Sequence, residues 1–176
     1  MNSNPFELLR QMSESIDSQA TTLPDSQQST DEWRGIGFSI AGVRFIAPMA
    51  EIAEILYVPD VTKVPGVKRW ANGIANVRGR LLSVIDLEQY FGEPGGVLGH
   101  RARILASNEH ELYTGFVVPE LLGMQTFTQD EYTPEVEIEE RFAPFTQGAY
   151  RRDDLDWKVF SLSKLVQSPE FLQVAV

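Results

Sequence analysis

Apolar and polar residues alternate over short segments along most of this chain, and turn-forming residues separate the segments. Pairs such as Ala41-Gly42 and Asp153-Asp154 fall between apolar runs, where hairpin turns are expected. Short strands at this spacing are typical of an all-β barrel rather than of alternating strands and helices. We therefore predict strands at about 35–41, 43–48, 52–58, 73–77, 81–85, 102–106, 112–118, 122–127, 148–151 and 157–161.

The first 32 residues have a different composition. Asn4, Pro5 and Glu7 combine an N-cap residue, a proline at the first helical position and a glutamate at the third, as in a capping box. Apolar residues follow at near-helical spacing as far as Ile16, and 17–31 is rich in Ser, Thr, Gln and Asp. We predict a flexible tail over 1–32 with a short helix. Two roles stay open: an ordinary disordered terminus, or a helix that docks on a partner.

The rest of the chain contains a faint internal repeat. The segment 45–48 (FIAP) recurs at 116–119 (FVVP), and 84–91 recurs at 159–166. In the second pair an apolar strand leads into a polar residue, Asp86 or Ser161, that can cap a short helix. The match is short, and chance remains an alternative to two similar β subdomains. The glycine-rich loop at 92–96 is expected to join the two halves, with the joint near 92–100.

The most informative segment is 71–87, ANGIANVRGRLLSVIDL. It predicts two strands around a tight turn at Arg78-Gly79, where Gly79 supplies a positive φ, and then a helix capped by Asp86. A guanidinium at Arg78 is placed to bind a carboxylate or a carbonyl of a partner.

Charge is distributed unevenly along the chain. The net charge of −10 argues against nucleic acid as a partner. All five charged residues between Val61 and Ile85 are basic, whereas all six between Asp130 and Glu140 are acidic. Solvated loops of opposite sign and a steering face for an acidic partner are both compatible with this pattern. The five basic residues are Lys63, Lys68, Arg69, Arg78 and Arg80.

The residues that catalysis needs are sparse. The chain has no cysteine, and its two histidines, His100 and His110, flank one predicted strand too far apart to share a metal ion. The acidic residues around 135–140 lie in a proline-containing loop that suits paired-carboxylate catalysis poorly. We find no nucleophile or phosphate-binding motif, no secretory signal and no run near the ~18 apolar residues of a spanning helix. A non-enzymatic chain without metal or cofactor is predicted, in the cytoplasm and not inserted in a membrane.

The 71–87 segment and its flanks resemble the CheW-like family, the coupling modules of bacterial chemosensory arrays. The family pattern is a Val-Pro, then Gly-x-x-Asn-x-Arg-Gly, then an apolar strand ending in Asp-Leu. Here it reads Val64-Pro65, then 73–79 (GIANVRG), then 82–87. The resemblance covers roughly 33–171. Within the family, the chain is similar to the adaptor of the system that controls type IV pili and twitching motility.

The resemblance implies two small interlocked five-stranded SH3-like β-barrels with short helices. It also implies an adaptor that bridges the regulatory domain of a CheA-type histidine kinase and the cytoplasmic tip of a methyl-accepting receptor, recruited to membrane-associated arrays. In the family, the first barrel binds the kinase and a groove between the barrels takes the receptor. The alternatives are a small β-barrel hydrolase and a free-standing SH3-type peptide binder.

Candidate binding residues come from the motif, from its basic flank and from the second half of the chain. Glu54, Gly73 and Arg78 match family positions tied to partner binding, and Val117 and Val118 match the receptor-facing apolar pair. Side chains alternate along a strand, so one valine is expected inside a barrel and the other at the receptor surface. Pro119, where the family often has Asp, is a departure from the pattern. The remaining candidates are Asn76 and Gly79 in the turn, and Lys68, Arg69 and Trp70, an aromatic ring beside a basic cluster.

Overall fold

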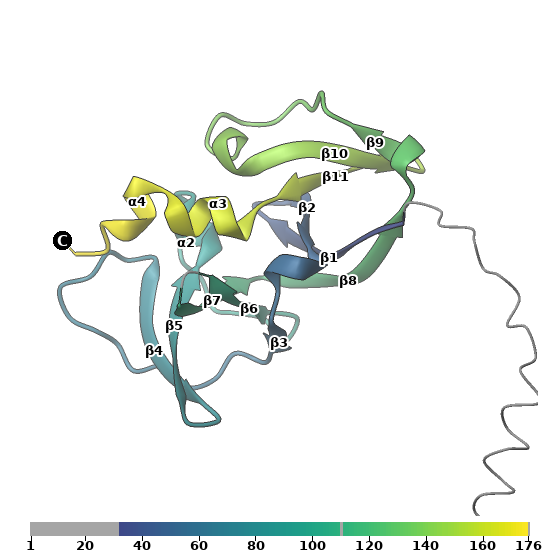
Figure 1. The fold of residues 1–176 in the computed structure, drawn as a ribbon. Coiled ribbons are helices and arrows are strands. Elements are labelled where there is room, and N and C mark those ends of the chain that lie inside the picture. Colours follow the sequence, from purple (N-terminus) through teal and green to yellow (C-terminus); the bar gives the residue numbers. More distant parts are fainter. Residues whose placement is uncertain (1–31, 110, 176) are drawn as a thin grey trace, which may run out of the picture. The chain divides into compact units, whose positions relative to one another are not determined.

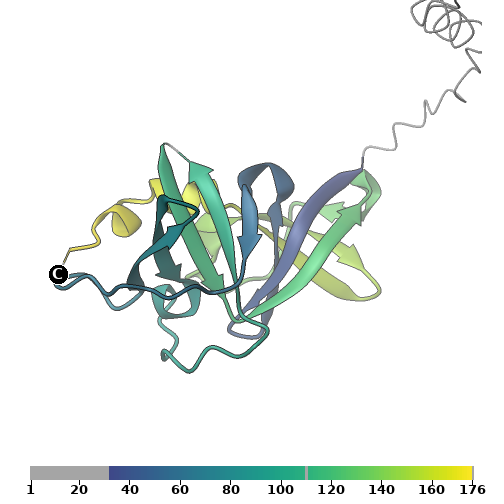
Figure 2. The same cartoon turned by 90° about the horizontal axis from the view of Figure 1, so that it is seen from below.

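The computed structural model describes residues 32–109 and 111–175. Glu32–Val176 forms one compact unit, distinct from Met1–Asp31. The predicted N-terminal helix and almost all of the predicted tail lie outside the described residues. Two β-sheets make up the described unit, and Figure 2 shows them side by side.

One sheet has six strands, in the order β8-β1-β2-β11-β10-β9. All neighbours are antiparallel except β2 and β11, which are parallel (Figure 1). The strands are β1 (Trp33–Ile40), β2 (Val43–Pro48), β8 (Glu120–Phe127), β9 (Tyr132–Thr133), β10 (Thr146–Arg152) and β11 (Leu155–Phe160).

The other sheet has five strands, in the order β3-β6-β7-β5-β4. Here too a single pair is parallel, β5 with β7. The strands are β3 (Glu54–Leu56), β4 (Ala71–Val77), β5 (Arg80–Asp86), β6 (Arg103–Glu109) and β7 (Leu112–Val118). The helices are η1 (Met49–Glu51), α2 (Leu87–Tyr90), η2 (Gln129–Glu131), η3 (Ala143–Phe145), α3 (Leu162–Gln167) and α4 (Pro169–Leu172).

The all-β prediction is confirmed, and each of the ten predicted strands is present. Two of them, β2 and β7, have the predicted bounds. The prediction missed β9, a two-residue strand that pairs with β10 after the acidic residues Asp130 and Glu131. One sheet therefore has six strands rather than the expected five.

The expected joint near 92–100 lies between the two sequence repeats but does not separate the two sheets. This segment connects α2 with β6, and the strands on either side of it, β5 and β6, belong to the same sheet. The first hairpin, β1–β2, instead pairs with β8 and β11 from the second half of the chain. If 92–100 is the border between two repeats, each repeat gives its first hairpin to the sheet of the other.

The two repeats place matching residues in matching positions of the core. Ile46 and its counterpart Val117 lie in the separate inner cores of the two sheets. Phe45 and its counterpart Phe116 both lie in the large core that the two sheets share. The parallel strand pair in each sheet joins a strand of one repeat to a strand of the other. The sequence repeat is therefore also a structural repeat.

The repeated polar caps are confirmed as well. The Asp86 carboxylate accepts a hydrogen bond from the backbone N–H of Gln89 at 3.1 Å, at the start of α2. The Ser161 hydroxyl accepts from the backbone N–H of Lys164 at 3.2 Å, at the start of α3. Each cap satisfies an amide that the helix leaves unpaired, and each fixes where a strand turns into a helix.

The shared core between the sheets is rich in aromatic rings. Phe45 and Phe160, from the parallel pair β2 and β11, have centroids 5.4 Å apart. Phe142, next to η3, lies 5.0 Å from Phe45 and 4.6 Å from Phe91. Ring contacts at these distances add to the hydrophobic stabilisation of burial, and they connect the sheets with the short helices.

The structure contradicts the prediction that one of Val117 and Val118 lies at a receptor surface. The two side chains do point to opposite faces of β7, and Val118 shares its face with Phe116. Neither valine lines a surface, however, because Val117 is 1% exposed and Val118 is 0% exposed. Both faces of β7 are covered at this point, one by the inner core and the other by the shared core. These two valines therefore cannot form a receptor-binding surface in this structure.

This burial predicts the outcome of aspartate substitutions along β7. Val117→Asp and Val118→Asp should each destabilise the fold by about 3 kcal/mol or more, because an unpaired carboxylate would lie in an apolar core. Leu112→Asp, on the same strand at a side chain that is 47% exposed, is the matched control and should stay folded. Chemical denaturation of the three variants measures the difference. A folded, stable Val118→Asp protein would show that the shared core is misassigned.

Candidate functional site

The turn between β4 and β5 has the predicted geometry. Gly79 has a φ of 81° and Arg78 a φ of 50°, both in the left-handed region. The Asn76 side-chain oxygen accepts a hydrogen bond from the backbone N–H of Gly79 at 2.9 Å, which closes the turn. Asn76 and Gly79 therefore shape the loop that projects Arg78, whose side chain is 79% exposed.

Glu54 and Arg78, 24 positions apart in the sequence, form an ion pair of 3.0 Å. The hydroxyl of Tyr113 donates a hydrogen bond to the same carboxylate, and the guanidinium of Arg80 lies over the Tyr113 ring, 4.1 Å from its centroid. Burial, and secondly the bond to Glu54, raise the pKa of the Tyr113 hydroxyl, which keeps it a donor. We call Glu54, Arg78, Arg80 and Tyr113 the polar cluster.

Sequence reasoning found half of this cluster. It identified Glu54 and Arg78 through the family resemblance but expected the guanidinium to be free for a partner carboxylate. The structure gives it an internal partner in Glu54 while leaving most of its surface open. Tyr113 and the contact between Arg80 and Asn108 (2.9 Å) were missed, because they depend on the order of the strands in the sheet, where β6 and β7 lie between β3 and β5.

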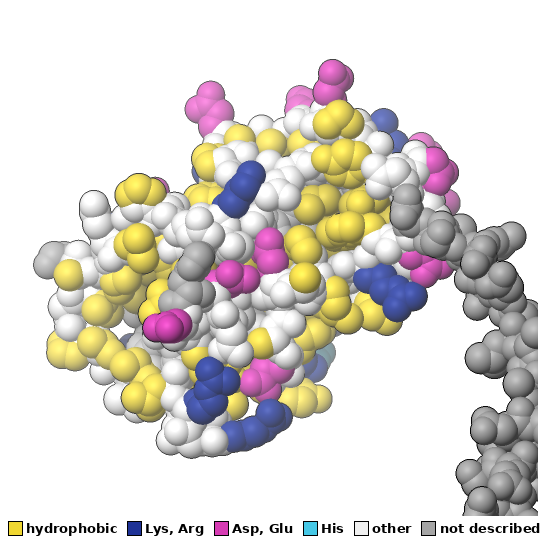
Figure 3. Space-filling view, in the orientation of Figure 1, with side chains coloured by type: hydrophobic (Ala, Val, Ile, Leu, Met, Phe, Trp, Pro, Cys, Tyr) yellow, Lys and Arg dark blue, Asp and Glu magenta, His cyan; other side chains and the backbone are white. Residues whose placement is uncertain are grey.

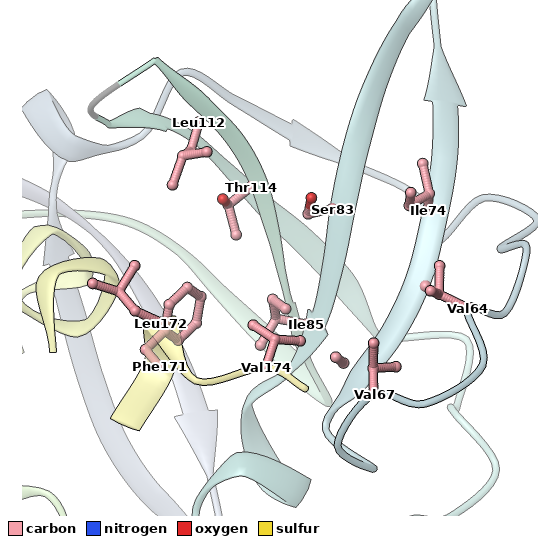
Figure 4. Close-up of a pocket in the computed structure, with 12 residues that line it drawn as sticks. Val64, Val67, Ile74, Ser83, Ile85, Leu112, Thr114, Phe171, Leu172 and Val174 are labelled. Carbon is pink, nitrogen blue, oxygen red and sulfur yellow. The ribbon is translucent and has the colours of Figure 1, made fainter. Parts of the chain in front are cut away.

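An apolar groove of about 300 Å³ lies on the other face of the same sheet. Ser83 and Thr114 are neighbours on β5 and β7 and lie on its floor, Ile74 borders it on β4, and Phe171 and Leu172 close it from α4 (Figure 4). Ile74 is 37% exposed and Leu172 is 60% exposed. In Figure 3 hydrophobic side chains gather on the side of the molecule where Figure 1 places β4 and α4.

The polar cluster and the groove are on opposite faces of the five-stranded sheet. Tyr113 and Thr114, which follow each other on β7, show this arrangement. Tyr113 belongs to the inner core and reaches Glu54, whereas Thr114 faces the groove. Side chains alternate across a strand, so these two directions diverge. One sheet thus presents two chemically different surfaces.

Gly73 borders the groove, and the local backbone explains why glycine is needed there. Its φ is 137°, and a Cβ atom would lie against the backbone carbonyl of Thr62, well inside contact distance. Thr62 and Ile74 exchange two backbone hydrogen bonds of 2.9 Å, which brings the 58–70 loop close to β4. Gly73 lets this loop lie along the strand that borders the groove.

The basic candidates and Trp70 have different positions. Lys68 and Arg69 lie with Lys63 around a hollow that shares Val64 and Val67 with the groove. Trp70 is only 7% exposed and stacks on Phe171 with centroids 5.5 Å apart. Of the two readings of Trp70, a core residue or an interface anchor beside the basic cluster, the structure therefore supports the core residue, because α4 covers this ring. Its indole supports the wall of the groove from inside.

The acidic segment is partly held by ion pairs. Glu131 contacts Arg152 at 2.6 Å, and this bond lowers the pKa of the Glu131 carboxyl to about 2. Glu139 contacts Arg141 at 2.8 Å, and Arg141 also contacts Glu93 at 2.7 Å. These ion pairs anchor the acidic loop to β10 and to the segment after α2.

Within 32–109 and 111–175 no group of three or more His, Asp or Glu side chains is arranged to hold a metal ion. No helix in this part of the chain has the length and hydrophobicity to span a membrane.

The chain is similar to known proteins in sequence and in fold. Residues 34–170 match the CheW-like domain. The chain is 39% identical over 173 residues to the protein PilI of Pseudomonas aeruginosa, covering 98% of this chain and 97% of that protein. It is 22% identical over 122 residues to the chemotaxis protein CheW of Thermotoga maritima, covering 69% of this chain and 80% of that protein.

The chain therefore belongs to the CheW-like family. Its fold is similar to that of the scaffolding protein TtCheW from Thermoanaerobacter tengcongensis, with a TM-score of 0.69 at 21% identity, covering 78% of this chain and 94% of that one. The predicted fold class, all-β with two SH3-like subdomains, is confirmed by this likeness and by the two sheets.

The position of Gly73 predicts a strong response to substitution. Gly73→Ala should cost about 3 kcal/mol or more, because the new methyl group meets Thr62 and the backbone is strained as well. Gly79→Ala is the matched control: its φ of 81° is also unfavourable for alanine, but its surroundings are open, so about 1 kcal/mol is expected. Urea denaturation of both variants tests this, and equal losses would contradict the role given to the Thr62 contact.

Proposed function

We propose that this chain is a non-catalytic adaptor that couples a methyl-accepting chemoreceptor to a CheA-type histidine kinase. We further propose that it acts in the cytoplasm, at membrane-associated receptor arrays, in the system that controls twitching by type IV pili. Membership of the CheW-like family supports the adaptor role, and 39% identity to PilI over nearly the whole chain supports the pilus system.

The observation that carries the proposal is the pair of surfaces on opposite faces of the five-stranded sheet. An adaptor has to hold two partners at the same time without one blocking the other. The polar cluster offers charge and hydrogen bonds, whereas the groove offers apolar area. Surfaces of different chemistry favour different partners, which limits exchange between them.

We assign a partner contact to the polar cluster. Glu54 holds Arg78 in position, and Arg78 remains 79% exposed at the tip of its turn. In Figure 3 Lys or Arg side chains lie beside Asp or Glu where Figure 1 places this tip. A positioned guanidinium keeps several free N–H donors, so a partner carbonyl or carboxylate can bind it without first ordering the side chain.

Charge reversal tests the assignment. Arg78→Asp should leave unfolding within about 0.5 kcal/mol of the unchanged chain, since an exposed turn arginine adds little to stability. It should weaken binding of the kinase regulatory domain, of the receptor tip, or of both by tenfold or more, at a cost of about 1.4 kcal/mol or more. Calorimetric titration with each purified partner measures this.

Arg34→Asp is the matched control. Arg34 is also an exposed arginine with a carboxylate partner at 3.0 Å, but it lies on β1 of the other sheet. The Arg34→Asp variant should therefore bind both partners normally. Loss of binding with both variants would point to net charge rather than to the polar cluster. If the unchanged chain fails to bind either partner, or cannot bind both at once, the adaptor proposal is wrong.

A further inference from the structure

A polar hollow of about 340 Å³ lies beside the apolar groove and differs from it in chemistry. The 58–70 loop, the start of β4 and α2 form its walls. It shares Val64, Val67 and Ala71 with the groove, but none of the strand residues on the groove floor. We call it the basic hollow. Its polar lining side chains are Lys63, Lys68, Arg69, Asn72 and Gln89.

The basic hollow brings together three cations that have no countercharge. Lys63, Lys68 and Arg69 form no ion pair with any residue in 32–109 or 111–175. Charges of the same sign in one cavity repel one another, and an anion between them would replace this repulsion with attraction. Phosphate oxygens also match the paired N–H donors of a guanidinium. The three cations therefore favour a ligand that carries phosphate.

The backbone near the three cations is fixed without the use of their side chains. Thr62, which precedes Lys63, exchanges two hydrogen bonds of 2.9 Å with Ile74 of β4. The backbone N–H of Lys68 donates to the carbonyl of Val174, also at 2.9 Å. Binding of a ligand therefore has to immobilise side chains but not the loop itself, which lowers the entropic cost of binding.

Two amide side chains lie in the same cavity as the cations. Asn72 is the extra residue of a β-bulge, because the register between β4 and β5 shifts between Ala71 and Gly73. A bulge turns a side chain out of the regular alternation, and here the Asn72 amide lines the basic hollow. Gln89 reaches the cavity from α2. Amides of this kind both donate and accept hydrogen bonds.

An adjoining hollow of about 260 Å³ adds a carboxylate. It shares Lys63, Asn72 and Gln89 with the basic hollow, and Asp86 lines it together with the glycine-rich loop after α2. Asp86 is 6% exposed, and its two oxygens accept from the backbone N–H and from the Nε2 atom of Gln89 at 3.1 and 2.9 Å. Each oxygen has a second lone pair, which suits a hydroxyl or amine donor of a ligand.

We propose that the two hollows form a binding site for a nucleotide, with its phosphate groups against the three cations and its ribose hydroxyls or base amine against Asp86. Carboxylates accept from ribose hydroxyls in dinucleotide-binding folds, and Asn and Gln amides pair with base edges. Both volumes lie near the lower end of the range for small-molecule sites, which suits a single nucleotide. The proposal goes beyond the adaptor role and does not rest on it.

Titration of the full-length chain with ADP and with GDP, in the absence of divalent metal ions, tests the proposal. The reference ligands are adenosine and guanosine, which lack phosphate, and inorganic pyrophosphate, which lacks ribose and base. At least one nucleotide should bind tenfold or more tightly than its nucleoside and than pyrophosphate. The amide NMR shifts that this nucleotide causes should fall on 63–72 and on 86–98.

Variants separate the phosphate contact from the contact with ribose and base. The double change of Lys68→Gln and Arg69→Gln should weaken both the nucleotide and pyrophosphate by tenfold or more. Asn72→Ala should weaken the nucleotide but leave pyrophosphate binding unchanged. Lys164→Gln is the matched control, because Lys164 is an exposed lysine on α3, away from both hollows, and this variant should bind as the unchanged chain does. Chemical denaturation checks that each variant is folded.

Several outcomes would overturn the proposal. Pyrophosphate that binds as tightly as the nucleotides would show a simple anion site, and nucleosides that bind as tightly would exclude a phosphate contact. The absence of saturable binding by either nucleotide, or NMR shifts confined to other segments, would exclude the site altogether. These titrations contain neither kinase nor receptor, so their failure is distinguishable from a failure of the adaptor proposal.

Discussion

The described unit depends on the pairing of its first hairpin with strands from the second half of the chain. β1 pairs with β8, and β2 lies parallel to β11, so residues more than a hundred positions apart share one sheet. Such non-local pairs are entropically costly to bring together, and the side chains they bury have to offset that cost. Phe45 and Phe160, one from each partner strand, meet in the aromatic core that the two sheets share.

This arrangement has consequences for an adaptor. The five-stranded sheet carries both candidate surfaces, and one of its faces packs on the shared core through Phe116 and Val118. The groove wall also comes from the chain's end, where Phe171 stacks on Trp70. The groove therefore exists only when the last residues are in place, whereas the polar cluster belongs to strands within 54–118. Two surfaces built on one packed unit keep a fixed spacing, as the coupling of two partners requires.

Local chemistry explains what could be predicted from the sequence. The turn at Arg78-Gly79 and the caps at Asp86 and Ser161 follow from the backbone preferences of single residues, and the alternating pattern located the strands. The alternation of Val117 and Val118 was predicted correctly, but not their burial, because periodicity shows which way a side chain points and not what covers it.

The remaining errors concern packing between distant segments. Nothing near Trp70 in the sequence shows that α4, a hundred residues later, covers its ring. The repeat indicated two similar halves, but it did not show that each first hairpin joins the sheet of the other half. Ile74 and Tyr113 both fall in predicted strands. Ile74 borders the groove only because β4, β5 and β7 follow one another in the sheet, and Tyr113 reaches Glu54 only because β6 places β7 near β3.

If the two sheets form one cooperative unit, as their shared core requires, native-state hydrogen exchange tests this most directly. The slowest amides of β1 and β2 and those of β5 and β7 should open with free energies within about 1 kcal/mol of each other, matching global unfolding by denaturant. Phe160→Leu in the shared core should lower both sets equally. If β5 and β7 stay protected after β1 and β2 have opened, the five-stranded sheet folds by itself and the claim is contradicted.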